Sequence, residues 1–224
     1  MDLKIALLDL MNKKKILIID MGLGNLGSVT SSIDRLGYES VKLKYPPQKE
    51  DSETYTHAIL PGVGSFCKGM ESLKSSGFAD WIINDWSYAE KPLLGICLGM
   101  QLLASSGDEG SKSNKIVKGL NLIPGEIKKI QVSQNLLLPH VGWNEVCWEN
   151  LEDIIVKDVP QKGDFYFVHS YVFLPDKKEN SLAKTIYGEC FTSVVKDRKC
   201  IGVQFHPEKS QKVGNILLKN FLDL

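Results

Sequence analysis

Residues 93–103 read Leu-Leu-Gly-Ile-Cys-Leu-Gly-Met-Gln-Leu-Leu. An apolar run typical of a short buried strand ends at Cys97, and the apolar residues after Gly99 have helical spacing. A side chain on such a tight strand-to-helix turn projects from the backbone, and small neighbours leave room for the turn and for a substrate. The free N–H groups at the start of the helix favour a thiolate. The segment therefore predicts a nucleophilic cysteine, although most free cysteines are inert buried side chains.

Strands and helices alternate through the first half of the chain. Strand patterns occur at residues 16–20, 39–43, 57–60 and 93–97, and helical patterns at 28–36 and 70–86. Strands separated by helices of this length favour a parallel sheet with right-handed crossovers. Ligands of such sheets bind outside the carboxyl ends of the strands, where Cys97 and the glycine-rich turns 22–27 and 62–64 all fall.

The second half, from about residue 120, is richer in strands. Segments 136–139, 165–173, 182–187, 192–196 and 200–205 carry β-branched or aromatic residues, and 215–224 has the pattern of an amphipathic helix. We expect one α/β domain over residues 14–224. Residues 1–13 precede the first regular strand and include a second possible start at Met11, so we expect an N-terminal extension or an edge strand there.

Composition excludes several classes of function. The 224 residues contain 27 lysines plus arginines and 27 aspartates plus glutamates, which favours neither nucleic acid nor an anionic membrane as partner. The five cysteines include no Cys-x-x-Cys pair, and neither glycine turn carries a complete nucleotide motif, so we expect no metal and no cofactor. No signal peptide or membrane span is recognisable, which favours the cytoplasm.

His206-Pro207-Glu208 follows the strand pattern of residues 202–205. Proline favours extended geometry in the residue before it, and in an extended stretch residues two apart project from the same side. The carboxylate of Glu208 can therefore orient the imidazole of His206, as an activated thiol requires. The tripeptide alone is weak evidence, and its combination with Cys97 is what predicts catalysis.

An acyl-transfer site also needs N–H donors for a developing oxyanion. The N–H of Leu98, directly after the nucleophile, is the natural first donor. Gly62-Val63-Gly64 can offer a second, because glycine permits a peptide to turn towards the site. The alternative is that Pro61-Gly62 merely opens a loop, as most such pairs do.

Residues 95–101 and 206–208 resemble the motifs of the triad glutamine amidotransferases. Further matching pieces follow in the family's order: Gly24-Asn25-Leu26, Leu60-Pro61-Gly62-Val63-Gly64, Gly119-Leu120, Ile123-Pro124-Gly125, Pro139-His140-Val141-Gly142-Trp143-Asn144, residues 165–171 and residues 204–210. The resemblance covers about residues 14–224. It implies a flavodoxin-like, doubly wound, mostly parallel sheet with a partly antiparallel second half. Within the family the chain is most similar to the glutaminase subunit of imidazole glycerol phosphate synthase, of the histidine pathway.

The resemblance also implies roles for single residues. Cys97 is expected to be the nucleophile, His206 the base and Glu208 the carboxylate that orients it. The residues expected to hold glutamine or its oxyanion are Gly62, Val63, Gly64, Leu98, Gln101, Glu109, His169 and Ser170. A role for His169 as a buried core histidine stays open, and we expect a structural or interface role for His140. The residues in segments that face a partner in relatives are Asn25, Trp143, Tyr166 and Lys209.

The family implies L-glutamine as substrate and a partner that uses the ammonia. Free ammonia is protonated in bulk water, so the family passes it through a tunnel into a synthase. In the histidine pathway that partner is a (β/α)₈ barrel cyclase, which predicts a heterodimer.

Two departures from the family pattern leave the partner open. Relatives commonly have Asp-Tyr-Gly where this chain has Asp20-Met21-Gly22, and residues 104–107 also differ from the commonest form. A paralogue that supplies ammonia to a sugar amidotransferase of surface-polysaccharide synthesis is therefore the main alternative. An inactive binding module and a cysteine peptidase of similar fold are further alternatives, but the complete triad argues against the first, and Gln101 with the His-Pro-Glu spacing argues against the second.

Overall fold

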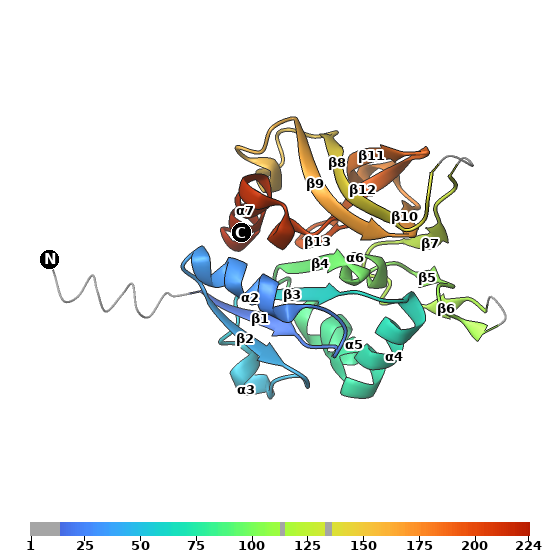
Figure 1. Ribbon diagram of the computed structural model, residues 1–224. Coiled ribbons are helices and arrows are strands. Elements are labelled where there is room, and N and C mark those ends of the chain that lie inside the picture. Colours follow the sequence, from blue (N-terminus) through green and yellow to red (C-terminus); the bar gives the residue numbers. More distant parts are fainter. Residues whose placement is uncertain (1–13, 113–114, 133–135) are drawn as a thin grey trace, which may run out of the picture.

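Five parallel strands form the centre of the computed structural model, which describes residues 14–112, 115–132 and 136–224 (Figure 1). The strands are β1 (Lys15–Ile19), β2 (Glu39–Leu43), β3 (His57–Gly62), β4 (Leu93–Cys97) and β13 (Cys200–Val203). They lie in the order β2-β1-β3-β4-β13 with all pairs parallel. This is the flavodoxin-like order, which confirms the predicted fold class. The predicted extension or edge strand at residues 1–13 lies outside the described residues.

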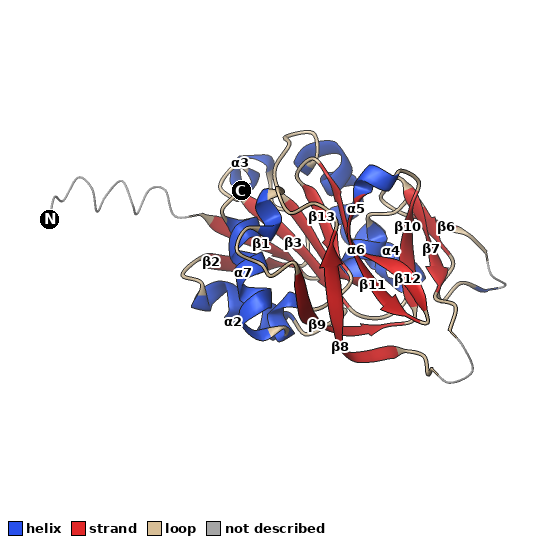
Figure 2. Cartoon of the chain, turned by 90° about the horizontal axis from the view of Figure 1, so that it is seen from above, coloured by secondary structure: helices blue, strands red, loops and turns tan. Residues whose placement is uncertain are grey.

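Helices cover both faces of these strands (Figure 2). Successive residues of a buried strand point to opposite faces, so Ile16 and Ile18 belong to one core and Leu17 and Ile19 to the other. The first core includes residues of α2 (Leu26–Arg35) and α7 (Gln211–Leu222). The second includes residues of α4 (Phe66–Ser76), α5 (Phe78–Trp81), the π-helical turn η1 (Ile82–Trp86) and α6 (Leu98–Leu102), and the short α3 (Lys49–Ser52) is exposed. No helix in the described part of the chain has the length and apolar character needed to cross a membrane.

The second half of the chain continues the sheet with mainly antiparallel strands, which confirms the predicted partly antiparallel second half. β12 (Glu189–Asp197) pairs with β13, and beyond it follow β10 (Tyr171–Pro175), β7 (Gly125–Lys129), β5 (Ser106–Gly107) and β6 (Val117–Lys118). Of these strands, β5 and β7 pair in parallel. A branch of β11 (Ser181–Tyr187), β8 (His140–Trp148) and β9 (Lys162–His169) leaves the sheet at β12 and arches above it (Figure 1). The short 3₁₀ turns are η3 (Ile154–Val156), η4 (Lys178–Asn180) and η5 (Pro207–Lys209).

Several predicted boundaries are wrong. The segment predicted as a strand at 136–139 is irregular, and the strand begins only at His140, since Pro139 has no N–H to give to a ladder. The predicted strand 165–173 is two strands, β9 and β10, interrupted at Ser170. The helices predicted from residues 28, 70 and 215 begin earlier. In α2 the reason is that the Asn25 side chain caps the helix by accepting a hydrogen bond from the Ser28 N–H.

Close backbone packing sets the position of the β4–α6 turn. A Cβ atom built on Gly99 would overlap the carbonyl group of Leu60 in β3, and one built on Gly95 would lie 2.6 Å from the carbonyl group of Gly99. Side chains at these two positions would therefore push the start of α6 away from the sheet. The two glycines allow α6 to lie directly on β3 and β4, and this contact places Cys97 at the carboxyl edge of the sheet.

Candidate active site

Cys97 occupies a strained turn between β4 and α6. Its backbone has φ 54° and ψ −108°, in the positive-φ region that residues with a Cβ rarely adopt. Such strain in a non-glycine residue persists only where the surrounding fold imposes it, and it is common at active sites. The side chain is buried, and its thiol donates a hydrogen bond to the Val168 carbonyl at 3.5 Å. The predicted strand-to-helix turn is therefore present at Cys97.

The structure brings His206 and Glu208 together behind this turn. Nδ1 of His206 lies 2.8 Å from Oε1 of Glu208, and both side chains are almost fully buried. The backbone of residues 207–209 is a 3₁₀ turn and not the predicted extended stretch, because the Ser210 N–H donates to the Pro207 carbonyl. The Ser210 hydroxyl donates to the His206 carbonyl at 2.6 Å and accepts from the Tyr166 N–H at 3.1 Å. These bonds fix the backbone at His206 against β9, together with the bond from the His206 N–H to the Tyr166 carbonyl.

The charge state of His206 depends on its two partners. Burial alone lowers the pKa of His206, but the hydrogen bonds and charges of Cys97 and Glu208 outweigh burial and raise that pKa well above its ordinary value. With Nδ1 held by Glu208, Nε2 is the ring nitrogen available to the thiol, and it has no other hydrogen-bond partner among the described residues. The arrangement can take a proton from the sulfur and hold it as an imidazolium.

The proposed oxyanion donors lie next to Cys97. Leu98 begins α6, and Gly62 pairs with Cys97 across β3 and β4. The sequence predicts a turn that includes Gly62, Val63 and Gly64. In the structure Gly62 is instead the last residue of β3, and the exposed residues Val63 and Gly64 follow it. Gly64 has φ +116°, a conformation natural to glycine. The Gly62–Val63 peptide is thus held on the strand beside the sulfur.

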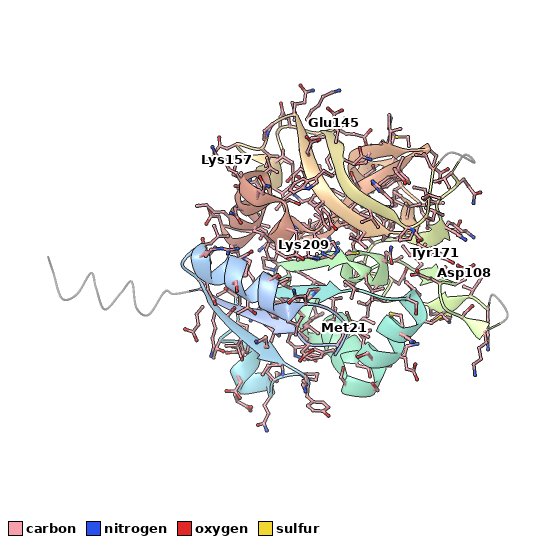
Figure 3. All side chains as sticks on the ribbon, viewed as in Figure 1. Met21, Asp108, Glu145, Lys157, Tyr171 and Lys209 are labelled. Atoms are coloured by element: carbon pink, nitrogen blue, oxygen red, sulfur yellow. The ribbon has the colours of Figure 1, made fainter. Side chains whose placement is uncertain are left out.

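Gln101 and Glu109 both make hydrogen bonds within the protein. Gln101 Nε2 donates to the Tyr171 carbonyl at 3.1 Å and to Gln204 Oε1 at 3.2 Å. Glu109 Oε2 accepts from the N–H of Phe66, at the start of α4, at 3.3 Å. Burial raises the pKa of Glu109, and the hydrogen bond from Phe66 opposes this. The charges of Glu109 and Asp108 add to burial in raising the pKa of Tyr171, which lies beside Asp108 in Figure 3.

His169 belongs to a hydrogen-bonded chain of neutral groups. Its Nδ1 lies 2.9 Å from the Tyr171 carbonyl, which can only accept, so Nδ1 carries the proton. Its Nε2 therefore accepts from Nδ1 of His140 at 3.0 Å, and Nε2 of His140 accepts from the Asn144 amide at 3.3 Å. Burial lowers the pKa of His169 to about 3 and that of His140 to about 4. The neighbouring Ser170, half-buried, accepts from the Ile130 N–H through its carbonyl.

The residues predicted to face a partner are accessible. Asn25 is exposed, and 49% of Trp143 is exposed. The ring centroids of Trp143 and Tyr166 are 6.0 Å apart, and Lys209 Nζ lies 5.6 Å from the Tyr166 centroid. Figure 3 shows Lys209 between the arched strands and the parallel sheet. In the described part of the chain no cluster of His, Cys, Asp and Glu side chains could hold a metal ion.

The family model of the class-I glutamine amidotransferases matches residues 17–224. The chain belongs to this family. The relatives of this amidotransferase include the imidazole glycerol phosphate synthase subunit HisH 1 of Prochlorococcus marinus, which is 54% identical over 93% of this chain and 97% of its own length. The HisH 2 subunit of Methanococcus maripaludis is 42% identical over 92% and 98% of the two chains.

Solved structures of other amidotransferases have the same fold. A protein from Thermoplasma acidophilum, described as a putative GMP synthase subunit, superposes with a TM-score of 0.70 at 18% identity, over 95% of this chain and 94% of the other. A second structure, described as a glutamine amidotransferase, gives 0.69 at 19% identity over 93% and 97% of the two chains. At such low identity these two structures establish the fold of the amidotransferase and nothing further.

Three groups that the sequence analysis did not single out complete the site of this amidotransferase. They are the Val168 carbonyl that accepts from the thiol, the Ser210 hydroxyl behind His206, and the Gln204 amide, whose Nε2 lies 3.7 Å from Cys97 Sγ. A backbone carbonyl leaves no sequence signal. Gln204 did leave one, since a polar side chain in an otherwise apolar strand pattern needs a buried partner.

Proposed function

We propose that the chain is the glutaminase subunit of an imidazole glycerol phosphate synthase and supplies ammonia for histidine biosynthesis. The proposal is supported by relatives of that name at 54% and 42% identity, which match almost their whole length. The observation that carries the chemistry is the convergence of a strained Cys97, the imidazole of His206 and the carboxylate of Glu208 at the carboxyl edge of the sheet.

The proposed reaction is hydrolysis of L-glutamine to glutamate and ammonia. The proton of the Cys97 thiol moves to Nε2 of His206, and the sulfur attacks the carbonyl carbon of the side-chain amide. The N–H of Leu98 and one from residues 62–64 receive the oxyanion. His206 then donates its proton to the departing ammonia, which leaves a thioester on Cys97. A water that gives its proton to His206 hydrolyses the thioester and releases glutamate.

Glutamine is expected to lie between α6 and the ends of β9 and β10. Both N–H groups of Gln101 are engaged within the protein, which leaves its amide oxygen to receive the α-amino group of the substrate. Glu109 is near enough to Tyr171 to affect the pKa of its phenol, and the carboxylate can accept a second bond from the same amino group. We place His169 and Ser170 on the opposite wall, where β9 ends beside the sulfur.

The partner that we propose is a (β/α)₈ barrel cyclase bound as a heterodimer. Asn25, Trp143, Tyr166 and Lys209 offer it an accessible face with an aromatic pair and a cation. A tunnel from this face would keep the ammonia from being protonated in water. Met21, where the chain departs from the common family pattern, is buried against Gly62 and therefore alters packing beneath the site more than the partner-facing surface.

The test is glutaminase activity, measured with the chain alone, with the barrel cyclase and with a sugar amidotransferase. We expect stimulation by the cyclase. Cys97→Ala should abolish glutamine-dependent synthesis by the complex, whereas synthesis from added ammonium salts should persist because the cyclase binds ammonia itself. Stimulation by the sugar amidotransferase alone would refute the histidine-pathway assignment, and glutamine-driven turnover by Cys97→Ala would refute the nucleophile.

A further inference from the structure

Gln204 is a fully buried polar residue in contact with the reacting sulfur. It directly follows β13, and its backbone N–H donates to the Ser193 carbonyl at 2.9 Å, which fixes the start of the side chain. Its Nε2 lies 3.7 Å from Sγ of Cys97, and its Oε1 accepts from Nε2 of Gln101 at 3.2 Å. The amide thus lies between the nucleophile and a residue of the nucleophile's own helix.

The orientation of the Gln204 amide follows from a backbone carbonyl. The carbonyl oxygen of Tyr171 can only accept, so Gln101 must turn its NH₂ group, and not its oxygen, towards Tyr171. The second N–H of the same group then points at Gln204. Because two donors would repel each other, Gln204 must accept this bond with its amide oxygen. The NH₂ group of Gln204 is therefore directed at the sulfur.

We propose that Gln204 is a catalytic residue whose side-chain N–H stabilises the Cys97 thiolate through a direct hydrogen bond. In the resting site the thiol donates to the Val168 carbonyl. Once the proton has moved from the sulfur to Nε2 of His206, that carbonyl faces an anion that it cannot stabilise. The Gln204 N–H then becomes a charge-assisted donor inside a buried site, where such bonds are strongest.

Gln101 has a positioning role in this scheme, in addition to any contact with the substrate. Without the NH₂ group of Gln101, the Gln204 amide is no longer held in one orientation and presents its N–H to the sulfur for only part of the time. The proposal rests on the proposed function, because it assigns Gln204 a step in the same glutaminase reaction. Its central claim nevertheless concerns the ionisation of one thiol, which can be measured without glutamine and without a partner.

The test is the rate at which iodoacetamide alkylates Cys97 between pH 5 and pH 9, followed by mass spectrometry of the peptide that contains this residue. Gln204→Met keeps the length of the side chain and removes the donor. We expect the profile to move upward by about one pH unit, so that alkylation near neutral pH slows roughly tenfold. Gln101→Leu should slow it less, and the double variant should be no slower than Gln204→Met, because the two residues act in one chain.

Asn180→Leu is the matched control, because it removes another buried side-chain amide, whose Nδ2 donates to the carbonyl of Lys196 in β12 and not to Cys97. It should lower the melting temperature and leave the Cys97 profile unchanged. If Gln204→Met fails to fold, Gln204→Glu keeps the acceptor for Gln101 and removes the N–H. A wild-type profile in a folded Gln204 variant would overturn the proposal. Absence of glutaminase activity in every wild-type complex would refute the proposed function. The alkylation profile of Cys97 would still decide whether Gln204 stabilises the thiolate.

Discussion

Gly95→Ala should weaken the fold and the nucleophile together. A Cβ atom at residue 95 would lie 2.6 Å from the carbonyl group of Gly99 and 2.7 Å from the N–H of Met100, both backbone atoms of α6. Ordinary contact begins near 3.4 Å, so α6 must move by up to 0.8 Å, the difference between 3.4 and 2.6 Å. Overpacking of this kind costs about 1–3 kcal/mol, and replacing a strand glycine by alanine returns about 0.5–1 kcal/mol. The net loss should be about 1–2 kcal/mol.

For a chain of this size that loss corresponds to a fall in melting temperature of roughly 2–8 °C. Cys97 lies at the start of the displaced helix, and a misplacement of about 1 Å can cost a hundredfold in rate, so glutaminase kcat should fall roughly ten- to a hundredfold. Gly163→Ala is the control, because the nearest atom to its added Cβ, in Phe165, is 3.6 Å away. Equal melting temperature and kcat for Gly95→Ala and the wild type would refute the packing argument.

Two further predictions concern buried titratable groups. Glu208→Gln should lower the pKa of His206 and reduce glutaminase kcat by about 10²–10⁴. In the wild type, the stabilisation from the His206–Glu208 pair is complete below the ordinary histidine pKa and is lost as the pH rises through the raised pKa of His206. Urea unfolding should therefore show that Glu208→Gln loses more unfolding free energy, relative to the wild type, at pH 6 than at pH 9. A larger loss at pH 9 would refute the coupling between His206 and Glu208. His140→Phe keeps the stacking on Tyr187 and removes a histidine whose pKa is lowered to about 4. The unfolded chain protonates that histidine as the pH falls, whereas the folded chain does not. Between pH 7 and pH 5 the unfolding free energy of the wild type should therefore fall by up to about 2 kcal/mol more than that of the variant. An equal fall in both proteins would contradict the neutral buried state of His140.

The parallel half of the fold could be predicted because four of its five strands, β1, β3, β4 and β13, are almost entirely buried. β4 begins and ends where its apolar run indicates, and the partly exposed edge strand β2 also has the predicted bounds. The alternation of helices and strands was enough to give the sheet. The antiparallel half was predicted less well. In the run 165–173 the aromatic pattern continues through Ser170, where the chain leaves β9 and enters β10 to join a different neighbour, β7. Strand pairing between segments distant in sequence decides that break, and a local pattern carries no information about it.

The catalytic side chains could be predicted from the sequence better than the hydrogen bonds that hold them in place. Cys97 and His206 could be recognised because turn geometry and proline restrict the backbone locally. The bonds that hold these groups come from β9, at Val168 and Tyr166, more than thirty residues from either. For His169, a period of two places it on the buried face with Phe165 and Phe167, but its pairing with His140 depends on the register between β8 and β9.

Tyr171 connects the two polar chains of the site through a single atom. Its carbonyl oxygen accepts from Gln101, which orients the Gln204 amide towards the sulfur, and from His169, which sets the tautomer of His140. A backbone carbonyl cannot be removed by substitution, and this one lies in β10, where Tyr171 pairs with Lys129 of β7. This carbonyl determines which atom donates and which accepts in Gln101 and Gln204 and in His169 and His140. The reason is that a neutral amide or imidazole that donates with one atom must accept with the other. The orientation of the thiolate donor and the tautomers of both histidines are therefore consequences of how β10 joins the sheet, whereas burial keeps the two rings neutral.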